Sequence, residues 1–243
     1  MKKQTIILLS IISIFIFTLL CAESNPHKIK RFSKSKKLMK RVYAGQQIAF
    51  YSGCTYEYKR IGKKEKIIVN PNSCGYKTRK DKKRGKYIEW EHVVPAWAFG
   101  HTRKCWRDGH YKCKKKGRSC CVKVDPVFRA MEADMHNLQP AIGELNSDRS
   151  NYKFSIIPGE AREYGDVDFE VDFKARLVEP RPSIRGDIAR TYFYMEKTYG
   201  VRISSRQKKL FDVWNKEDPV DDWEKYRNKR IKSIQGNSND FIK

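Results

Sequence analysis

The sequence predicts an α+β fold, a single mixed domain whose C-terminal part is helical. Three observations support this prediction. β-rich and alternating stretches lie between residues 46 and 173, apolar residues recur at helical spacing from residue 187 to 235, and no internal repeat or long low-complexity linker divides the 243-residue chain. A chain of this length can bury a core without depending on disulfides.

The elements before residue 100 follow from periodicity and turn residues. A helix is expected over 32–43, where apolar residues recur at helical spacing before Gly45. Short strands and turns are expected over 46–76, because β-rich pieces are broken there by Gly and by Asn-Pro-Asn. A basic loop over 77–86 then leads into a strand over 87–94.

After residue 100 the chain is predicted to combine a loop, two helices and a strand, and to be helical from residue 187 onward. A cysteine-rich basic loop spans 100–121, one helix covers 126–136, and a second begins at Pro140 and ends near Ser150, since proline costs little at the first helical position. Residues 167–173 alternate apolar and acidic side chains, which is typical of a strand with one wet face. Three helices follow, over 187–199, 205–215 and 221–235.

The N-terminus has the pattern of a secretory signal peptide over residues 1–22. A positively charged start precedes an apolar run from Ile6 to Leu20, and Ala22 is a small residue before the cleavage point. An uncleaved anchor is the weaker alternative, because the run is shorter than the ~20 residues of a spanning helix. A lipoprotein, with a lipid attached to Cys21, is a weaker alternative still. The predicted mature domain, 23–243, is periplasmic or secreted, monomeric and without stable membrane association.

Removal of the signal leaves six of the seven cysteines. An even number in an oxidising compartment predicts three disulfides. The spacings are not the CxxC pairs of zinc sites, so zinc is the weaker alternative. Adjacent cysteines hardly pair with each other, so we expect one bridge between the first two and two bridges within 105–121; the six are Cys54, Cys74, Cys105, Cys113, Cys120 and Cys121.

The formal net charge of +24 exceeds what solubility requires. It predicts a polyanionic partner, with nucleic acid ahead of an anionic membrane or glycan. The cysteine-rich loop supplies candidate contacts to a nucleic-acid backbone, namely Arg103, Arg107, Lys112 and Arg118. Charge alone implies binding and not cleavage.

Two segments carry residues suited to phosphodiester chemistry, and the first is Glu-Trp-Glu-His at 89–92. His92 is the candidate general base, because an imidazole titrates near neutrality. Glu91 is an oxygen ligand of the kind Mg²⁺ prefers, whereas Glu89 is expected on the strand surface. Adjacent residues of a regular strand face opposite ways, so the strand must end or bulge for Glu91 and His92 to share a site.

The second segment runs from residue 132 to 149. The Asn146 amide oxygen can ligate Mg²⁺, and Arg149, three residues on, is a candidate for a catalytic phosphate contact or an ion pair. Glu132 and His136 are one turn apart and either orient His92 and the metal or form an ordinary surface pair. A histidine and a glutamate on a strand, followed by an asparagine on a helix, match the logic of a ββα-metal nuclease site.

Four long strings are also similar to the bacterial endonuclease I family of periplasmic and secreted nonspecific nucleases. They are EWEHVVPAWAFG, MEADMHNLQPAIGELNSDRSNY, RGDIARTYFYMEKTYG and FDVWNKEDPVDDWEKYRNKRI, and the resemblance extends from about residue 33 to 240. It implies a ββα-metal (His-Me finger) core, dependence on Mg²⁺, and cleavage of DNA and often RNA with little sequence preference. Mn²⁺ and Ca²⁺ accept the same oxygen ligands.

The resemblance also assigns roles to individual positions. It implies His92 as the general base, Glu91 and Asn146 as metal ligands, and Glu132 as a further important carboxylate. The family's phosphate-contacting arginine falls in the loop 107–118, where the length differs. The candidates there are Arg107 and Arg118, and the aligned position is Tyr111 or Lys112.

Two other classes of function fit parts of the sequence. A non-catalytic secreted protein that binds nucleic acid or another polyanion would explain the charge, but not the presence of Glu91, His92 and Asn146 together. A zinc hydrolase using His101, His110 and cysteines would lack an HExxH helix and would need free thiols in an oxidising compartment.

Overall fold

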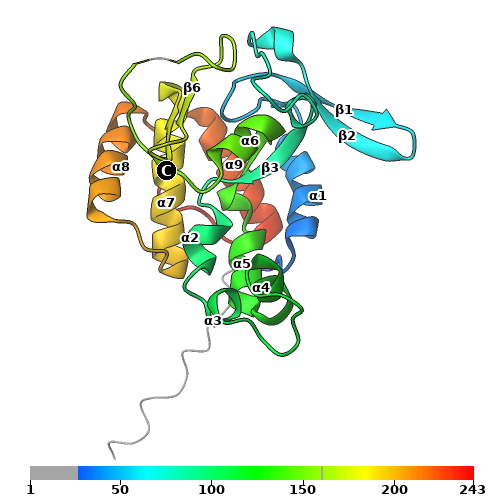
Figure 1. The fold of residues 1–243 in the computed structure, drawn as a ribbon, viewed down its shortest axis with the longest axis vertical. Helices are drawn as coiled ribbons and strands as arrows, with labels where there is room; N and C mark the ends of the chain where they lie inside the picture. The colour runs from blue at the N-terminus through cyan, green and yellow to red at the C-terminus, as the bar shows by residue number, and fades with distance from the viewer. Residues whose placement is uncertain (1–26, 160) are drawn as a thin grey trace, which may run out of the picture.

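The computed structural model describes residues 27–159 and 161–243 (Figure 1). The predicted signal peptide, residues 1–22, lies outside the described residues. Within them, no helix is both long and apolar enough to cross a membrane. The fold is α+β, as predicted: a single domain in which helices surround small sheets.

Short elements fill the first half of the chain. In order they are α1 (Phe32–Val42), β1 (Tyr56–Ile61), β2 (Lys64–Val69), η1 (Pro71–Ser73), η2 (Arg84–Lys86), β3 (Ile88–His92), α2 (Ala96–Gly100), α3 (Lys104–Arg107), α4 (Arg118–Val124) and α5 (Pro126–Ala133). The β-rich piece at 47–51 forms only a bridge between Ile48 and Thr55. β1 and β2 make an antiparallel hairpin that projects from the body at the upper right of Figure 1.

Longer helices dominate the second half, as the sequence predicted. The elements are η3 (Met135–Asn137), β4 (Leu138–Ile142), α6 (Gly143–Arg149), β5 (Lys153–Phe154), β6 (Phe169–Asp172), β7 (Leu177–Pro180), η4 (Pro182–Ile184), α7 (Arg185–Tyr199), α8 (Ser205–Glu217) and α9 (Asp222–Gln235). Side-chain caps start α8 at Ser204 and α9 at Asp221, which satisfies backbone N–H groups at the helix starts. α7 and α8 pack side by side at the left of Figure 1.

Two antiparallel strands and a helix form the centre of the molecule. β3 pairs with β4, with Glu91 opposite Gln139 and His92 opposite Leu138, and α6 follows β4 directly. The predicted helix start at Pro140 is wrong, because Pro140 lies within β4 opposite Trp90. In the described chain β4 pairs with β3 alone, so its other edge tolerates the missing proline N–H.

Three disulfides secure the loops around this centre. Their pairs are Cys54–Cys74, Cys105–Cys121 and Cys113–Cys120, which confirms one bridge between the first two cysteines and two within 105–121. The last two connect α3, α4 and the basic loop between them. These bridges leave none of the six cysteines as a free thiol, so the zinc-hydrolase alternative loses its cysteine ligands.

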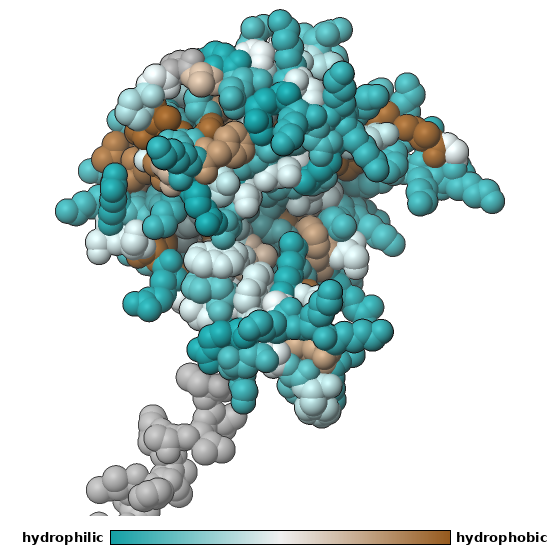
Figure 2. Space-filling model, viewed as in Figure 1, coloured by the Kyte–Doolittle hydropathy of each residue, from teal (hydrophilic) through white to brown (hydrophobic). Residues whose placement is uncertain are grey.

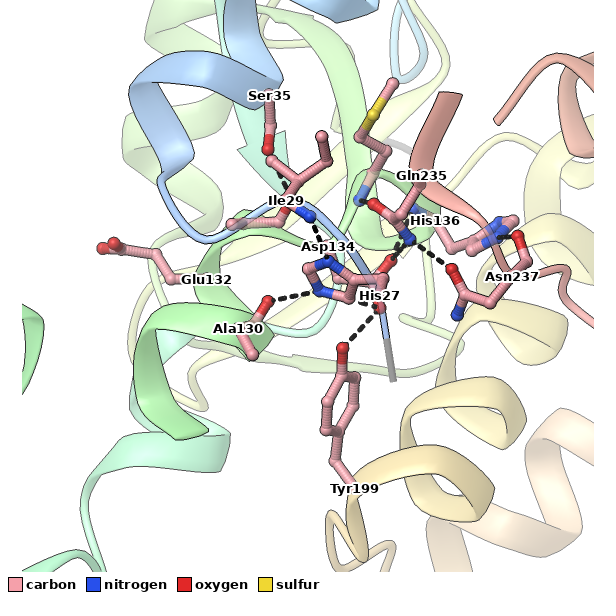
Figure 3. A network of polar contacts seen from close by, with 12 residues as sticks. His27, Ile29, Ser35, Ala130, Glu132, Asp134, His136, Tyr199, Gln235 and Asn237 are labelled. Atoms are coloured by element: carbon pink, nitrogen blue, oxygen red, sulfur yellow. Dashed lines mark hydrogen bonds and ion pairs between the residues drawn. The ribbon is translucent and has the colours of Figure 1, made fainter. Parts of the chain in front are cut away.

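A buried carboxylate joins the beginning and the end of the described chain (Figure 3). Asp134 accepts hydrogen bonds from the hydroxyls of Tyr194 and Tyr199 on α7 and from the Gln235 amide at the end of α9. The His27 ring lies 3.9 Å away and bonds to the Ala130 carbonyl. Burial raises the pKa of Asp134, but the nearby histidines and hydroxyls outweigh it and hold the pKa below its usual value.

Candidate active site

A cleft of about 540 Å³ runs along β3. α1, the loop after β3, α4 and α6 complete its walls. The predicted base and both predicted metal ligands line it, as does one of the candidate phosphate-binding arginines; the lining includes Glu89, Glu91, His92, Arg118, Asn146 and Ser150. Segments 50 residues apart in sequence are therefore brought together, as the sequence analysis expected.

His92 is the last residue of β3, so the strand ends where the sequence argument required. Its ring Nε2 lies 2.8 Å from the backbone carbonyl of Glu132, and since a carbonyl only accepts, Nε2 carries the hydrogen. Nδ1 then holds the lone pair, and no described residue forms a hydrogen bond with it. Burial lowers the pKa of His92 to about 3, and the Arg118 guanidinium adds to the effect. The imidazole is therefore neutral at pH 7.

Glu91 directly precedes His92 in β3 and lines the same cleft. Its Oε1 accepts from the Tyr51 hydroxyl at 3.0 Å and lies 3.4 Å from the Arg149 guanidinium. Burial raises the pKa of Glu91 to about 7, although Arg149 and the Tyr51 hydroxyl act in the opposite direction. One oxygen is thus fixed by protein donors, while the side chain still borders the cleft.

Asn146 lies on α6 and borders the cleft beside Glu89. Its Nδ2 donates to Glu89 Oε2 at 2.8 Å, which leaves the amide oxygen as the atom available to a cation. Arg84 also donates to Glu89, with Nε 3.0 Å from Oε1. The sequence predicted only that Glu89 lies on the strand surface. In the structure Glu89 also fixes the orientation of the Asn146 amide.

Glu132 acts on the site through two different groups. Its backbone carbonyl orients the His92 ring, and its carboxylate accepts from Arg118 Nε at 2.7 Å. The Glu132 side chain is 7% exposed and that of Arg118 is 46% exposed, so the guanidinium reaches from a buried anchor into the cleft. Among the arginines considered for phosphate contact, Arg118 is the one that lines the cleft.

The prediction of a catalytic Arg149 needs correction, because its side chain is 0% exposed. The guanidinium bonds to the carbonyl oxygens of Val93 and Ser150, pairs with Glu91, and lies 4.7 Å over the Phe154 ring. A group enclosed in this way cannot contact a substrate. Arg149 instead holds Glu91 and the chain that leaves β3.

The other predicted backbone contacts lie outside the cleft. Arg103 pairs with Asp125, which also caps α5, so its role is structural. Arg107 is exposed and pairs with Asp108, and Lys112 lies 5.4 Å from the Tyr111 ring in the same exposed loop. His136, the other member of the predicted Glu132 pair, is buried and bonds to the Asn237 carbonyl.

The oxygen atoms of the cleft suit a hard divalent cation. A Glu91 carboxylate and an Asn146 amide oxygen form a small donor set, and Mg²⁺ commonly binds through one or two protein groups while keeping several waters. No group of three or more His, Cys, Asp and Glu residues suited to a metal occurs in the described ranges. A carboxylate and an amide oxygen are donors that suit Mg²⁺ better than zinc, which favours Cys and His.

Sequence reasoning missed several residues of the cleft. Phe32 and Lys36 on α1 and Arg84 before β3 all border it, and Tyr51 reaches Glu91 from an irregular segment. Glu89, whose part in the cleft was also not predicted, is the one with a usable signal in the sequence. Residues two apart in a strand share a face, so Glu89 lies on the same face of β3 as Glu91. The others depend on tertiary packing.

Comparison with known proteins identifies the family of this chain. The endonuclease I family model matches residues 26–243. An extracellular deoxyribonuclease of Aeromonas hydrophila is 47% identical over 229 residues, covering 93% of this chain and 95% of its own. A periplasmic deoxyribonuclease of the same species is 41% identical over 242 residues (99% and 97%), and Endonuclease-1 of Buchnera aphidicola subsp. Acyrthosiphon pisum is 45% identical over 214 residues (88% and 81%).

The fold, the cleft and these relatives place the chain among the nucleases that hydrolyse phosphodiester bonds. Their names also agree with the predicted location, periplasmic or secreted. Within that class, the chain belongs to the endonuclease I family.

Proposed function

We propose that this protein is a periplasmic or secreted endonuclease that hydrolyses DNA and RNA to products with 5′-phosphates. The observation that carries the proposal is the orientation of His92. Its Nε2 is fixed by the Glu132 carbonyl, so Nδ1 is left without a protein partner on a side chain that borders a basic cleft. The A. hydrophila relatives, named deoxyribonucleases, support DNA as the substrate.

His92 acts as the general base in this proposal. Its neutral Nδ1 accepts a proton from a water molecule that attacks the scissile phosphate. A pKa of about 3 makes a weak base in the free protein. A phosphodiester bound beside Arg118 brings negative charge that offsets the guanidinium, which raises the pKa of His92 towards the working range.

Arg118 and the oxygen ligands handle the negative charge. The Arg118 guanidinium donates to a phosphate oxygen while Glu132 holds it in place. Glu91 and Asn146 would hold Mg²⁺, which when bound supplies neutralising charge for the transition state and for the leaving 3′-oxygen. Glu89 keeps the Asn146 amide turned so that its oxygen, and not its nitrogen, is available.

Little sequence preference is expected from this cleft. Its cations, Lys36, Arg84 and Arg118, suit phosphate oxygens, which carry no base identity. The same backbone recognition extends the proposal to RNA.

A plasmid-nicking assay tests the proposal on the disulfide-bonded protein. We expect nicking with Mg²⁺, none with EDTA, and a rate lower by about 10²–10⁴-fold for His92→Ala, with duplex binding largely retained. His110→Ala is the matched control, because His110 is exposed in the basic loop outside the cleft. Full activity of the His92→Ala variant would show that His92 is not the general base. A native protein that retards DNA but never cuts it would favour the polyanion-binding alternative.

A further inference from the structure

A second hollow, of about 690 Å³, lies beside the active-site cleft. It is bounded by α2, the segment after α6, the turn before β7 and the start of α8. The residues that decide its chemistry are Trp97, Tyr152, Ile156, Arg176, Arg206 and Leu210. None of them has a role in the hydrolysis proposed above.

Neighbouring residues line the hollow and the cleft at two places. In α2, Ala96 lines the cleft and Trp97 lines the hollow. After α6, Ser150 lines the cleft and Asn151 lines the hollow. The hollow therefore adjoins the cleft, and a strand with one phosphate at His92 can extend towards it.

Apolar and aromatic groups are exposed inside this hollow. Trp97 is 47% exposed and Ile156 is 48% exposed, on a surface that is otherwise largely hydrophilic. Figure 2 shows hydrophobic residues gathered at the upper left, where α8 and the segment over β6 lie in Figure 1. The Trp97 ring is held in place by stacking on His101, with centroids 3.9 Å apart and planes within 7°. The Trp97 ring is thus rigid and partly open to solvent.

Cations stand at the rim of the hollow. Arg176 donates to Asn151 at 3.0 Å and lies 5.3 Å from the Tyr152 ring. Neither Arg176 nor Arg206 forms an ion pair with a described carboxylate, so both can receive phosphate. Arg176 (φ +59°) and Ser150 (φ +52°) are the non-glycine residues with left-handed backbone in the described chain, and such strain concentrates at functional sites.

We propose that this hollow binds an unpaired nucleotide of the substrate strand next to the scissile phosphate. The base stacks against Trp97 beside Ile156, and the adjoining phosphates lie against Arg176 and Arg206. An aromatic platform with cations at its rim is the arrangement that binds single-stranded nucleic acid. A base within a duplex is already stacked and paired, so the occupant is an unpaired or frayed nucleotide. This inference rests on the proposed nuclease function.

The test compares two fluorescent octamers of equal charge, one of thymidines and one whose eight sugars carry no base. Both are bound to the His92→Ala protein in EDTA, so that nothing is cut, and affinity is read by fluorescence anisotropy. The comparison does not require a fixed register, because all positions are alike. We expect the thymidine octamer to bind about tenfold more tightly, which is the effect of one stacked base.

Adding Trp97→Ala should remove most of this tenfold ratio. Adding Tyr226→Ala should preserve it, because Tyr226 is 44% exposed but lies on α9 outside both the cleft and the hollow. Equal affinities for the two octamers, or an unchanged ratio with Trp97→Ala, would overturn the nucleotide site while native protein still nicks plasmid. A native protein that neither nicks plasmid nor binds either octamer would overturn the nuclease function as well.

Discussion

Replacing Arg149 with methionine separates a positioning role from a phosphate-binding role. Methionine keeps much of the aliphatic length and removes the guanidinium. In the native protein this group lies 3.4 Å from Glu91 Oε1 and donates to the carbonyl oxygens of Val93 and Ser150. The substitution leaves these buried acceptors without their donor.

Breaking a buried ion pair by removing one partner costs about 3–5 kcal/mol. For a domain of this size each kcal/mol lowers the melting temperature by about 2–4 °C, so Arg149→Met should melt about 6–20 °C lower. Because Arg149 opposes the effect of burial on the pKa of Glu91, that pKa rises further in the variant. At pH 6 Glu91 is then largely protonated in both proteins, whereas at pH 8 it is ionised in the native protein, so the loss of stability should be smaller at pH 6 than at pH 8.

Thermal unfolding followed by circular dichroism measures the effect, and DNA binding at low temperature accompanies it. The control is Arg107→Met, whose exposed pair with Asp108 should leave the melting temperature unchanged within error. An Arg149→Met protein that melts with the native one but no longer binds DNA would refute the positioning role. Arg149 would then contact phosphate, as the sequence suggested.

Three further predictions concern the surroundings of the cleft. Burial raises the pKa of Glu144, but hydrogen bonds from Tyr76 and from the backbone of the loop 77–86 hold this pKa below its usual value. The ionised Glu144 carboxylate therefore stabilises the fold above the unfolded pKa of about 4.3, and this stabilisation is lost as the pH falls below it. Urea unfolding should show that Glu144→Gln is destabilised at pH 7 and less so at pH 3.5. An equal loss of unfolding free energy at the two pH values would contradict this. Arg118→Met should raise the KM for plasmid. It should also raise the pKa of His92 above about 3, which NMR titration can follow, and an unchanged pKa would exclude an interaction between Arg118 and His92. Reduction of the disulfides should slow cleavage. The Cys105–Cys121 bridge, with a sequence separation of 16, adds about 3 kcal/mol to the free energy of unfolding and lies near the segment that carries Arg118. Equal cleavage rates with and without a reductant would contradict this prediction.

The sequence predicted which residues meet in the cleft better than it predicted the contacts that support them. Glu91, His92 and Asn146 were singled out from their chemistry and from the resemblance to a nuclease family, and all three line the cleft. Pro140 was misassigned because a proline suits both a helix start and an unpaired strand edge, and only the pairing with β3 decides between them.

The arginines show the limit of such reasoning. Arg118 and Arg149 look equally suited to phosphate in the sequence, but one is anchored at the cleft by Glu132 and the other is enclosed beside Phe154. Burial of a long polar side chain depends on contacts between distant segments, which periodicity does not contain. The same holds for Tyr51, whose hydroxyl reaches Glu91 across 40 residues.

The network around Asp134 bears on when the enzyme becomes complete during synthesis and export. Gln235 donates to Asp134, and Arg227, also on α9, donates to the carbonyl oxygens of Met135, which begins η3, and of Leu138, which begins β4. A chain that leaves the ribosome N-terminus first supplies these donors last. The strand that pairs with His92 therefore lacks its support until nearly the whole chain has been made. We therefore expect the cleft to be completed late, after the C-terminal helix has been made.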